Sequence, residues 1–270
     1  MSTDRKQRRL RRKQLLDLGL AALTRGLRPA PERDSVLGLA IVLHAALMDT
    51  ARADRASHAA SLMHGVFEAS LKAQPPRLAI ACKAGCDYCC SNWVSATAPE
   101  LFLIARVLRS KSRPTSLPPD PELVERLQQT AGISILDRFG RKLPCGLLVA
   151  GRCSIYATRP TVCRQATSTN LAACIEEFDG KDFDGEIVVS RVMLDHARNC
   201  RVPLQVALRA CGLADAGYEL SAGLLAAQRE GAEAAWLSGA NLFDGVASSP
   251  DDPPEFRAMI AAMVDDVRAL

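Results

Sequence analysis

The chain has 270 residues, ten cysteines and few aromatic residues (4%), and its formal net charge is +4. Residues 1–13 hold seven of the 34 basic groups and one of the 30 acids, which leaves 27 basic and 29 acidic groups, net −2, for the rest. The longest apolar run, 36–48, is too short to span a bilayer and no secretory signal opens the chain, so we expect a cytoplasmic protein without a transmembrane segment.

A basic helix is predicted at the start of the chain, because leucines recur near the helical period within residues 1–27. Its cations lie at 5–13, where they could contact nucleic acid or an anionic membrane surface. A solvated terminus is the simpler interpretation of such a charge run. A protein partner is conceivable as well, but no motif specifies one.

Helical patterns dominate the remaining chain. Residues 34–73 carry one long pattern with a polar middle at 49–57, which predicts two helices or one bent helix. Pro75 and Pro76 end this pattern, and Pro99 and Pro121 suit the first positions of two later helices. Further helical patterns follow at 188–200, 203–211, 218–229 and 254–270.

We therefore predict a mostly α fold, in which a helical domain surrounds an irregular, loop-built, cysteine-rich metal centre. The predicted divisions are a basic N-terminal arm at 1–33, a helical segment at 34–76, a cysteine-cluster core at 77–180, and a C-terminal helical segment at 181–270 that packs on the core.

The first cysteine group places four thiols within nine residues, at Cys82, Cys86, Cys89 and Cys90. In a reducing compartment, such clustered cysteines are typical of metal ligands rather than disulfides. The Cys86-x-x-Cys89 spacing lets two thiols face one ion while nearby backbone amides donate to the sulfurs. Cys82 can add a third thiolate. Because adjacent side chains tend to point apart, Cys90 either serves a second ion or remains a spare thiol.

A second cysteine group follows in the irregular stretch after Gly140, at Cys145, Cys153, Cys163 and Cys174. Pro160 suits a first helical position, which places Cys163 in the first turn, where the helix dipole favours a thiolate. Arg159 and Arg164 bracket Cys163. We expect both arginines to offset the negative charge of a thiolate centre from outside the ligand shell.

The sequence also contains Cys145 preceded by proline and the motif G-x-C-x-I-Y-x-x-R-P-x-x-C-R at 151–164. Together with the first cysteine group, these features resemble the YkgJ-like cysteine cluster proteins. That family is named for its CxxCxxCC motif and described as chelating zinc or iron. The first interval here is three residues rather than two. The resemblance covers roughly residues 78–180 and implies a role near the metal for Tyr156. The implied metal ligands are Cys82, Cys86, Cys89, Cys90, Cys145, Cys153, Cys163 and Cys174.

Three functions remain open at this point. The preferred one is a metal-binding protein with an eight-cysteine centre in a structural or metal-handling role. The second is an iron–sulfur metalloenzyme, since the family is similar to a lysine N-methylase group, but no catalytic residue can be named. The third is a zinc-stabilised nucleic-acid-binding protein.

The cofactor is zinc or an iron–sulfur cluster, because four cysteines can hold either. Cys200 and Cys211 lie in helical patterns, where a free cysteine packs as a small apolar residue.

Overall fold

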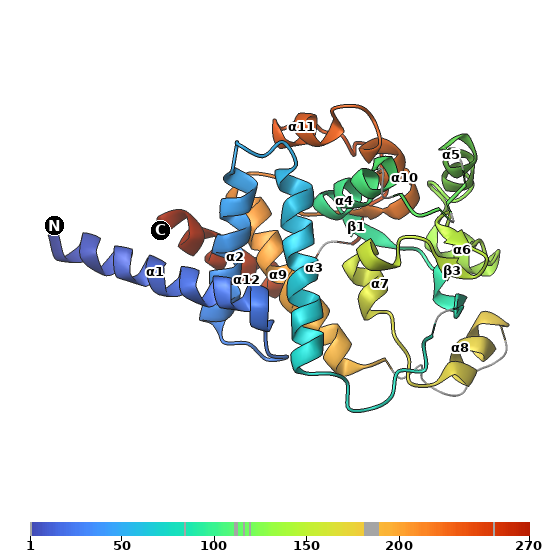
Figure 1. Ribbon diagram of the computed structural model, residues 1–270, viewed down its shortest axis with the longest axis horizontal. Coiled ribbons are helices and arrows are strands. Elements are labelled where there is room, and N and C mark those ends of the chain that lie inside the picture. The colour runs from blue at the N-terminus through green and yellow to red at the C-terminus, as the bar shows by residue number, and fades with distance from the viewer. Residues whose placement is uncertain are drawn as a thin grey trace. The chain divides into compact units, whose positions relative to one another are not determined.

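The computed structural model describes residues 2–83, 85–110, 113–115, 117–118, 120–180, 189–250 and 252–270. Twelve α-helices and four strands of two or three residues are formed within these ranges (Figure 1). The strands make two separate antiparallel pairs. The mostly α fold predicted from the sequence is confirmed.

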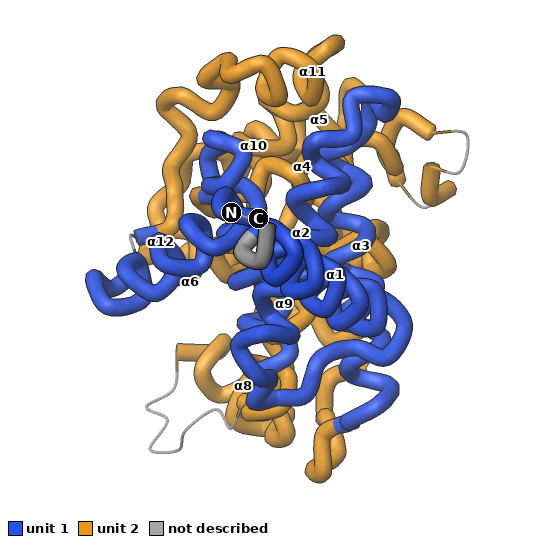
Figure 2. The backbone as a smooth tube through the Cα atoms, turned by 90° about the vertical axis from the view of Figure 1, so that its left-hand side faces the viewer, with its two compact units in different colours: residues 1–75, 195–215, 250–270 blue, residues 76–194, 216–249 orange. Residues whose placement is uncertain are grey.

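Two compact units divide the chain, and neither is contiguous in sequence (Figure 2). Unit 1 combines residues 1–75, 195–215 and 250–270, and unit 2 combines 76–194 and 216–249. These units differ from the four consecutive segments that the sequence predicted, because the C-terminal residues 181–270 are shared between both.

Unit 1 is a bundle of helices. It contains α1 (Ser2–Arg25), α2 (Arg33–Met48), α3 (Arg55–Ala73), residues 195–210 of α9 (Arg191–Ala210) and α12 (Pro254–Ala269). The predicted break at 49–57 separates α2 from α3. Gly19 and Gly38 allow α1 and α2 to touch, since a Cβ on Gly19 would meet the Gly38 carbonyl oxygen at 2.1 Å. Buried side chains from α1, α2, α9 and α12 form one core cluster.

One helix boundary in unit 1 differs from the prediction. Pro203 was expected to begin a helix but lies inside the continuous helix α9. A proline there removes the backbone N–H that would bond to the carbonyl four residues earlier. The residue whose backbone carbonyl loses this bond is Asn199. Its side chain makes another contact, because Nδ2 donates to the Arg28 carbonyl oxygen at 2.7 Å.

Unit 2 consists of shorter elements joined by long loops. Its helices are α4 (Ala98–Arg109), α5 (Asp120–Gln128), α6 (Ile135–Gly140), α7 (Thr161–Gln165), α8 (Leu171–Phe178), α10 (Leu220–Ala227) and α11 (Ala232–Leu237). The predicted helix starts at Pro99 and Pro121 each fall one residue inside the observed helix. Strand β1 (Ser95–Thr97) pairs with β4 (Gly217–Glu219), and β2 (Leu148–Val149) pairs with β3 (Arg152–Cys153).

Candidate metal centre

The eight predicted cysteine ligands all lie in unit 2, on loops and short elements. Cys82 and Cys86 are in the loop that leads to a short 3₁₀ turn, η1 (Tyr88–Ser91), which carries the next two. The others lie before β2, on β3, on α7 and on α8, at Cys145, Cys153, Cys163 and Cys174 respectively. Short elements of this kind bring cysteines from distant parts of the sequence to one region.

Backbone hydrogen bonds join these cysteine segments directly. The Cys145 amide donates to the Cys90 carbonyl oxygen at 2.9 Å, which connects the second cysteine group to the first. The Ala81 amide donates to the Ser168 carbonyl oxygen at 2.8 Å, and the Ser168 amide donates to Cys82 Sγ at 3.3 Å. The segment between Cys163 and Cys174 is therefore attached to the start of the first group.

Three of the thiols repeat one local arrangement. In each, the backbone amide two residues further along donates to the sulfur: Tyr88 to Cys86, Leu147 to Cys145, and Ile155 to Cys153. An amide that donates to sulfur stabilises the thiolate over the thiol and lowers its pKa. These turns therefore favour the form of cysteine that binds metal.

The eight thiols fall into two neighbourhoods that meet at Cys89. Cys86 interacts electrostatically with three thiols, which are Cys82, Cys89 and Cys174. Cys163 interacts with those of Cys145, Cys153 and Cys89, and Cys90 interacts with those of Cys89, Cys145 and Cys153. We call the four thiols that line one cavity, Cys82, Cys86, Cys89 and Cys174, set A, and the other four, Cys90, Cys145, Cys153 and Cys163, set B. Cys89 also interacts with Cys90, Cys153 and Cys163 of set B. Each set has the four sulfur donors that a tetrahedral zinc site or an iron–sulfur cluster uses.

The corner between the two sets differs from the prediction. Cys89 and Cys90 were expected to point apart, but their thiols hydrogen bond to each other. This hydrogen bond lowers the pKa of Cys89 to about 7, although burial opposes it, and raises the pKa of Cys90.

Burial keeps most of the other thiols protonated. It is the first cause of the raised pKa values of Cys86, Cys145, Cys153 and Cys163, and nearby thiols add to it in all four. A thiol in a dry environment loses its proton most readily to a bound cation, which supplies the compensating charge.

Set A lines a cavity of about 180 Å³. The rest of its wall is partly aromatic, from Tyr88, Phe139 and Phe178, and partly polar, from Asn92, Thr167, Ser168 and Glu177. Within the described ranges, no three Cys, His, Asp or Glu side chains lie close enough together to hold an ion as they stand. The eight thiols nevertheless supply the sulfur donors that a zinc or iron site uses.

Two of the three residues predicted to surround the centre, Arg159 and Arg164, lie close to Cys163, and Tyr156 contacts Arg159. The charge of Arg159 lowers the pKa of Cys89, Cys153 and Cys163, but burial outweighs it at Cys153 and Cys163, whose pKa values are raised. Its guanidinium carbon is 3.6 Å from the centre of the Tyr156 ring. The buried Arg164 side chain instead donates to backbone, with Nε 3.1 Å from the Arg159 carbonyl oxygen.

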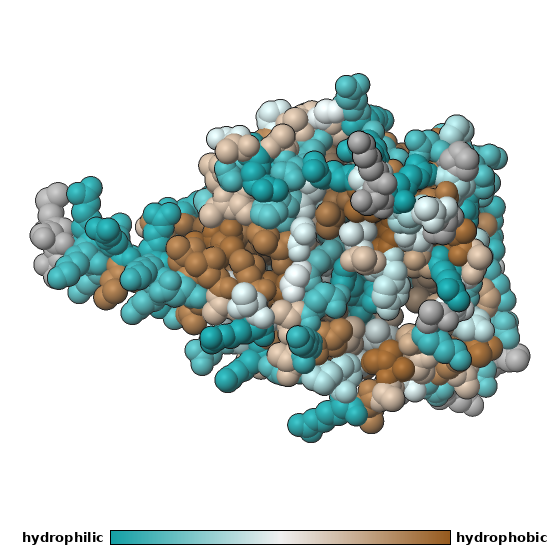
Figure 3. Space-filling model, viewed as in Figure 1, coloured by the Kyte–Doolittle hydropathy of each residue, from teal (hydrophilic) through white to brown (hydrophobic). Residues whose placement is uncertain are grey.

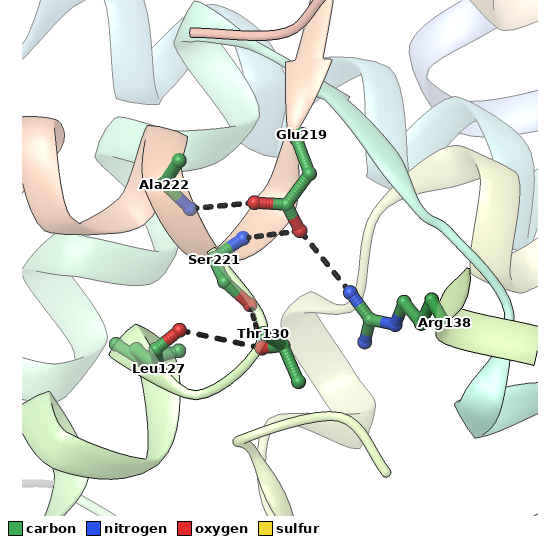
Figure 4. Close-up of polar contacts among 6 residues, drawn as sticks. All are labelled: Leu127, Thr130, Arg138, Glu219, Ser221 and Ala222. Atoms are coloured by element: carbon green, nitrogen blue, oxygen red, sulfur yellow. Dashed lines mark hydrogen bonds and ion pairs between the residues drawn. The ribbon is translucent and has the colours of Figure 1, made fainter. Parts of the chain in front are cut away.

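Sequence reasoning missed two buried acidic residues that organise this unit. Glu100 accepts hydrogen bonds from the amide and hydroxyl of both Thr97 and Thr161, at 2.7–2.9 Å, so it links the start of α4 to α7. Glu219 forms an ion pair with Arg138 and caps α10 (Figure 4). A capping signal at Thr97-x-x-Glu100 was readable in the sequence. The partners Thr161 and Arg138 were not, because they are 61 and 81 residues away.

Cys200 and Cys211 lie in unit 1 and not with the other eight cysteines. Cys200 is buried on α9. The nearby His196 has its Nε2 3.0 Å from the Gln74 carbonyl oxygen and its ring edge-on to Phe67.

A comparison with protein families finds a match over the part of the chain that holds the eight cysteines. Residues 81–183 match the family model CxxCxxCC, described as "Putative zinc- or iron-chelating domain". The chain carries a CxxCxxCC domain. The resemblance inferred from the two cysteine motifs is confirmed, and the CxxCxxCC domain contains all eight cysteines of sets A and B.

No curated protein and no solved structure matches the chain. A membrane-crossing helix would have to be both long and apolar, and none of the helices in the described ranges meets both conditions.

Proposed function

We propose that the CxxCxxCC domain binds two metal centres, one in set A and one in set B, and that these centres hold unit 2 in its folded form. The observation that carries the proposal is that all eight cysteines lie in unit 2 and that Cys89 and Cys90 interact with thiols of both cysteine groups. Amide donors at Cys86, Cys145 and Cys153 support it, because they favour thiolates.

A folding role for the metal agrees with how little regular structure surrounds the thiols. The helices that follow the first cysteine group include α6, α7 and α8, which are six, five and eight residues long. Helices this short gain little stability on their own. Metal ligation supplies that stability directly, because a site absent from the unfolded chain couples binding to folding.

The two sets differ in their surroundings, which supports two centres with different accessibility. All four thiols of set A line the cavity. In set B, burial strongly raises the pKa of Cys163. Set B would then hold a closed, structural ion, and set A would hold the more exchangeable one.

The test is to purify the protein without oxygen, and to measure zinc, iron and sulfide together with the visible spectrum. Brown protein with iron and sulfide identifies a cluster, and colourless protein with two zinc ions identifies two closed sites. Protein that carries no stoichiometric metal and is held by disulfides would refute the proposal.

Single substitutions distinguish two centres from one. We expect Cys86→Ser to lose the metal of set A and Cys163→Ser to lose that of set B, each removing about half of the total. Cys211→Ser is the matched control, because Cys211 lies in unit 1, and it should retain both. Equal losses in all three variants would contradict the assignment.

A further inference from the structure

The first half of α1 carries a long exposed stretch. Every residue from 5 to 14 is exposed, and burial begins only at Leu15, which is 1% exposed. Figure 1 shows α1 extending beyond α2, the helix against which its second half packs. Because these ten residues are exposed, this stretch of α1 contributes nothing to the core of unit 1.

These exposed residues carry an unusual density of positive charge. Seven of the nine residues at 5–13 are basic, whereas the rest of the chain has a net charge of −2. Arg11 is paired with Asp34, with Nη1 2.7 Å from Oδ2. Five other exposed cations are Arg5, Lys6, Arg9, Arg12 and Lys13. Hydrophilic side chains cover this part of α1 in Figure 3.

The distribution of these cations around the helix limits what they can bind. At 3.6 residues per turn, the basic positions spread over an arc of roughly 220°. The remaining strip contains Gln7, Leu10 and Gln14, so a single apolar side chain is exposed there. A helix that lies in a membrane surface needs a continuous apolar face opposite its basic one. The first half of α1 lacks such a face.

We propose that the first half of α1 binds the phosphate backbone of duplex DNA without reading its sequence. A helix of about 10–12 Å diameter enters a major groove about 12 Å wide, and a broad basic arc can then meet phosphates on both sides. Arginine and lysine are the usual partners of DNA phosphates, and such contacts position a protein without specifying bases. This activity belongs to unit 1 and does not depend on the metal sites.

The experiment is fluorescence anisotropy of a 20-base-pair duplex of arbitrary sequence, titrated with the full metal-loaded chain between 50 and 200 mM salt. Five phosphate contacts predict a slope of log K against log salt of about −4.5, which is a loss of roughly 500-fold in affinity over that range. Replacing the five cations with glutamine should abolish this binding. Circular dichroism and metal content should stay unchanged.

A matched control removes the same charge from elsewhere on the chain. Its five exposed sites, each changed to glutamine, are Lys72, Arg77, Arg141, Arg201 and Arg229. The control should keep the parent slope. Equal weakening in both variants would overturn the proposal, because net charge alone would then explain binding. Binding to vesicles with 30% anionic lipid but not to the duplex would overturn it as well.

Discussion

The ion pair between Arg138 and Glu219 gives the most specific prediction about the stability of unit 2. Both side chains are 0% exposed, and Arg138 Nη1 is 3.1 Å from Glu219 Oε1 (Figure 4). Glu219 also accepts hydrogen bonds from the amides of Ser221 at 3.0 Å and Ala222 at 2.7 Å. Arg138→Met removes the cation and leaves a carboxylate in the interior.

The expected magnitude follows from this environment. Removing one partner of a buried ion pair costs about 3–5 kcal/mol, because the other charge stays buried without compensation. We expect Arg138→Met to lower the free energy of unfolding by about 3 kcal/mol, the lower end of this range, for two reasons. The two amides continue to stabilise the carboxylate, and Nε and Nη2 of Arg138 have no hydrogen-bond partner, so the native pair is itself incompletely satisfied. The double variant Arg138→Met/Glu219→Gln removes both charges and should recover at least half of the loss.

Urea unfolding of the metal-loaded protein measures these values, with metal content determined on the same samples. Arg33→Met is the control, because Arg33 pairs with Asp266 on the surface and both side chains are more than 40% exposed. Exposed pairs contribute about 0–1 kcal/mol. A loss below about 1 kcal/mol for Arg138→Met, or a double variant no more stable than the single one, would refute the reasoning.

Three further predictions concern other parts of the structure. Glu100→Gln turns an amide NH₂ toward the Thr161 donors, so buried donors lose their acceptor. We expect the free energy of unfolding in urea to fall by about 1–3 kcal/mol and the metal content to fall as well. Gly38→Ala places a Cβ 2.3 Å from a carbonyl oxygen of α1 and should lower the free energy of unfolding by about 1–3 kcal/mol in the same assay. Its control is Gly65→Ala, whose Cβ meets nothing within 4 Å and should stabilise the helix by about 0.5–1 kcal/mol. Lowering the pH from 8 to 6 should weaken zinc binding, because burial raises the pKa of groups such as Cys86 and protons then compete with the metal. For a site of four protonated thiols the affinity falls by up to about 10⁴-fold per pH unit, which a chelator competition measures. Equal effects at the two glycines, or a zinc affinity independent of pH, would contradict these assignments.

The helices could be predicted from the sequence because their signals are local. Apolar residues at helical spacing and prolines at helix ends placed α2, α3, α4 and α12 within a few residues of their observed bounds. The α9 helix shows the limit of this reasoning. Its interior Pro203 was interpreted as a helix start, because a sequence pattern does not show the packing that keeps a helix continuous across a proline.

The candidate site could be predicted only in part, for a related reason. The family resemblance implied a group of eight cysteine ligands, which stays a prediction, and it left open how the thiols divide. Whether Cys89 and Cys90 face one ion or two depends on the direction of side chains in a 3₁₀ turn, which residue spacing does not determine. The links from Glu100 to Thr161 and from Glu219 to Arg138 join residues far apart in the chain, so no local pattern could reveal them.

The 81-residue separation between Arg138 and Glu219 has a consequence for biosynthesis. At about 5–20 residues per second, roughly 4–16 s pass between the synthesis of the arginine and that of its partner. All eight thiols have left the peptidyl-transferase centre before Glu219 is made. Strand β1 waits longer than Arg138 does, because its partner residues in β4 lie 120–124 residues further along the chain. A fragment that ends with the CxxCxxCC domain at residue 183 would lack both partners permanently. Expression of that fragment alone is therefore expected to yield an incompletely folded chain.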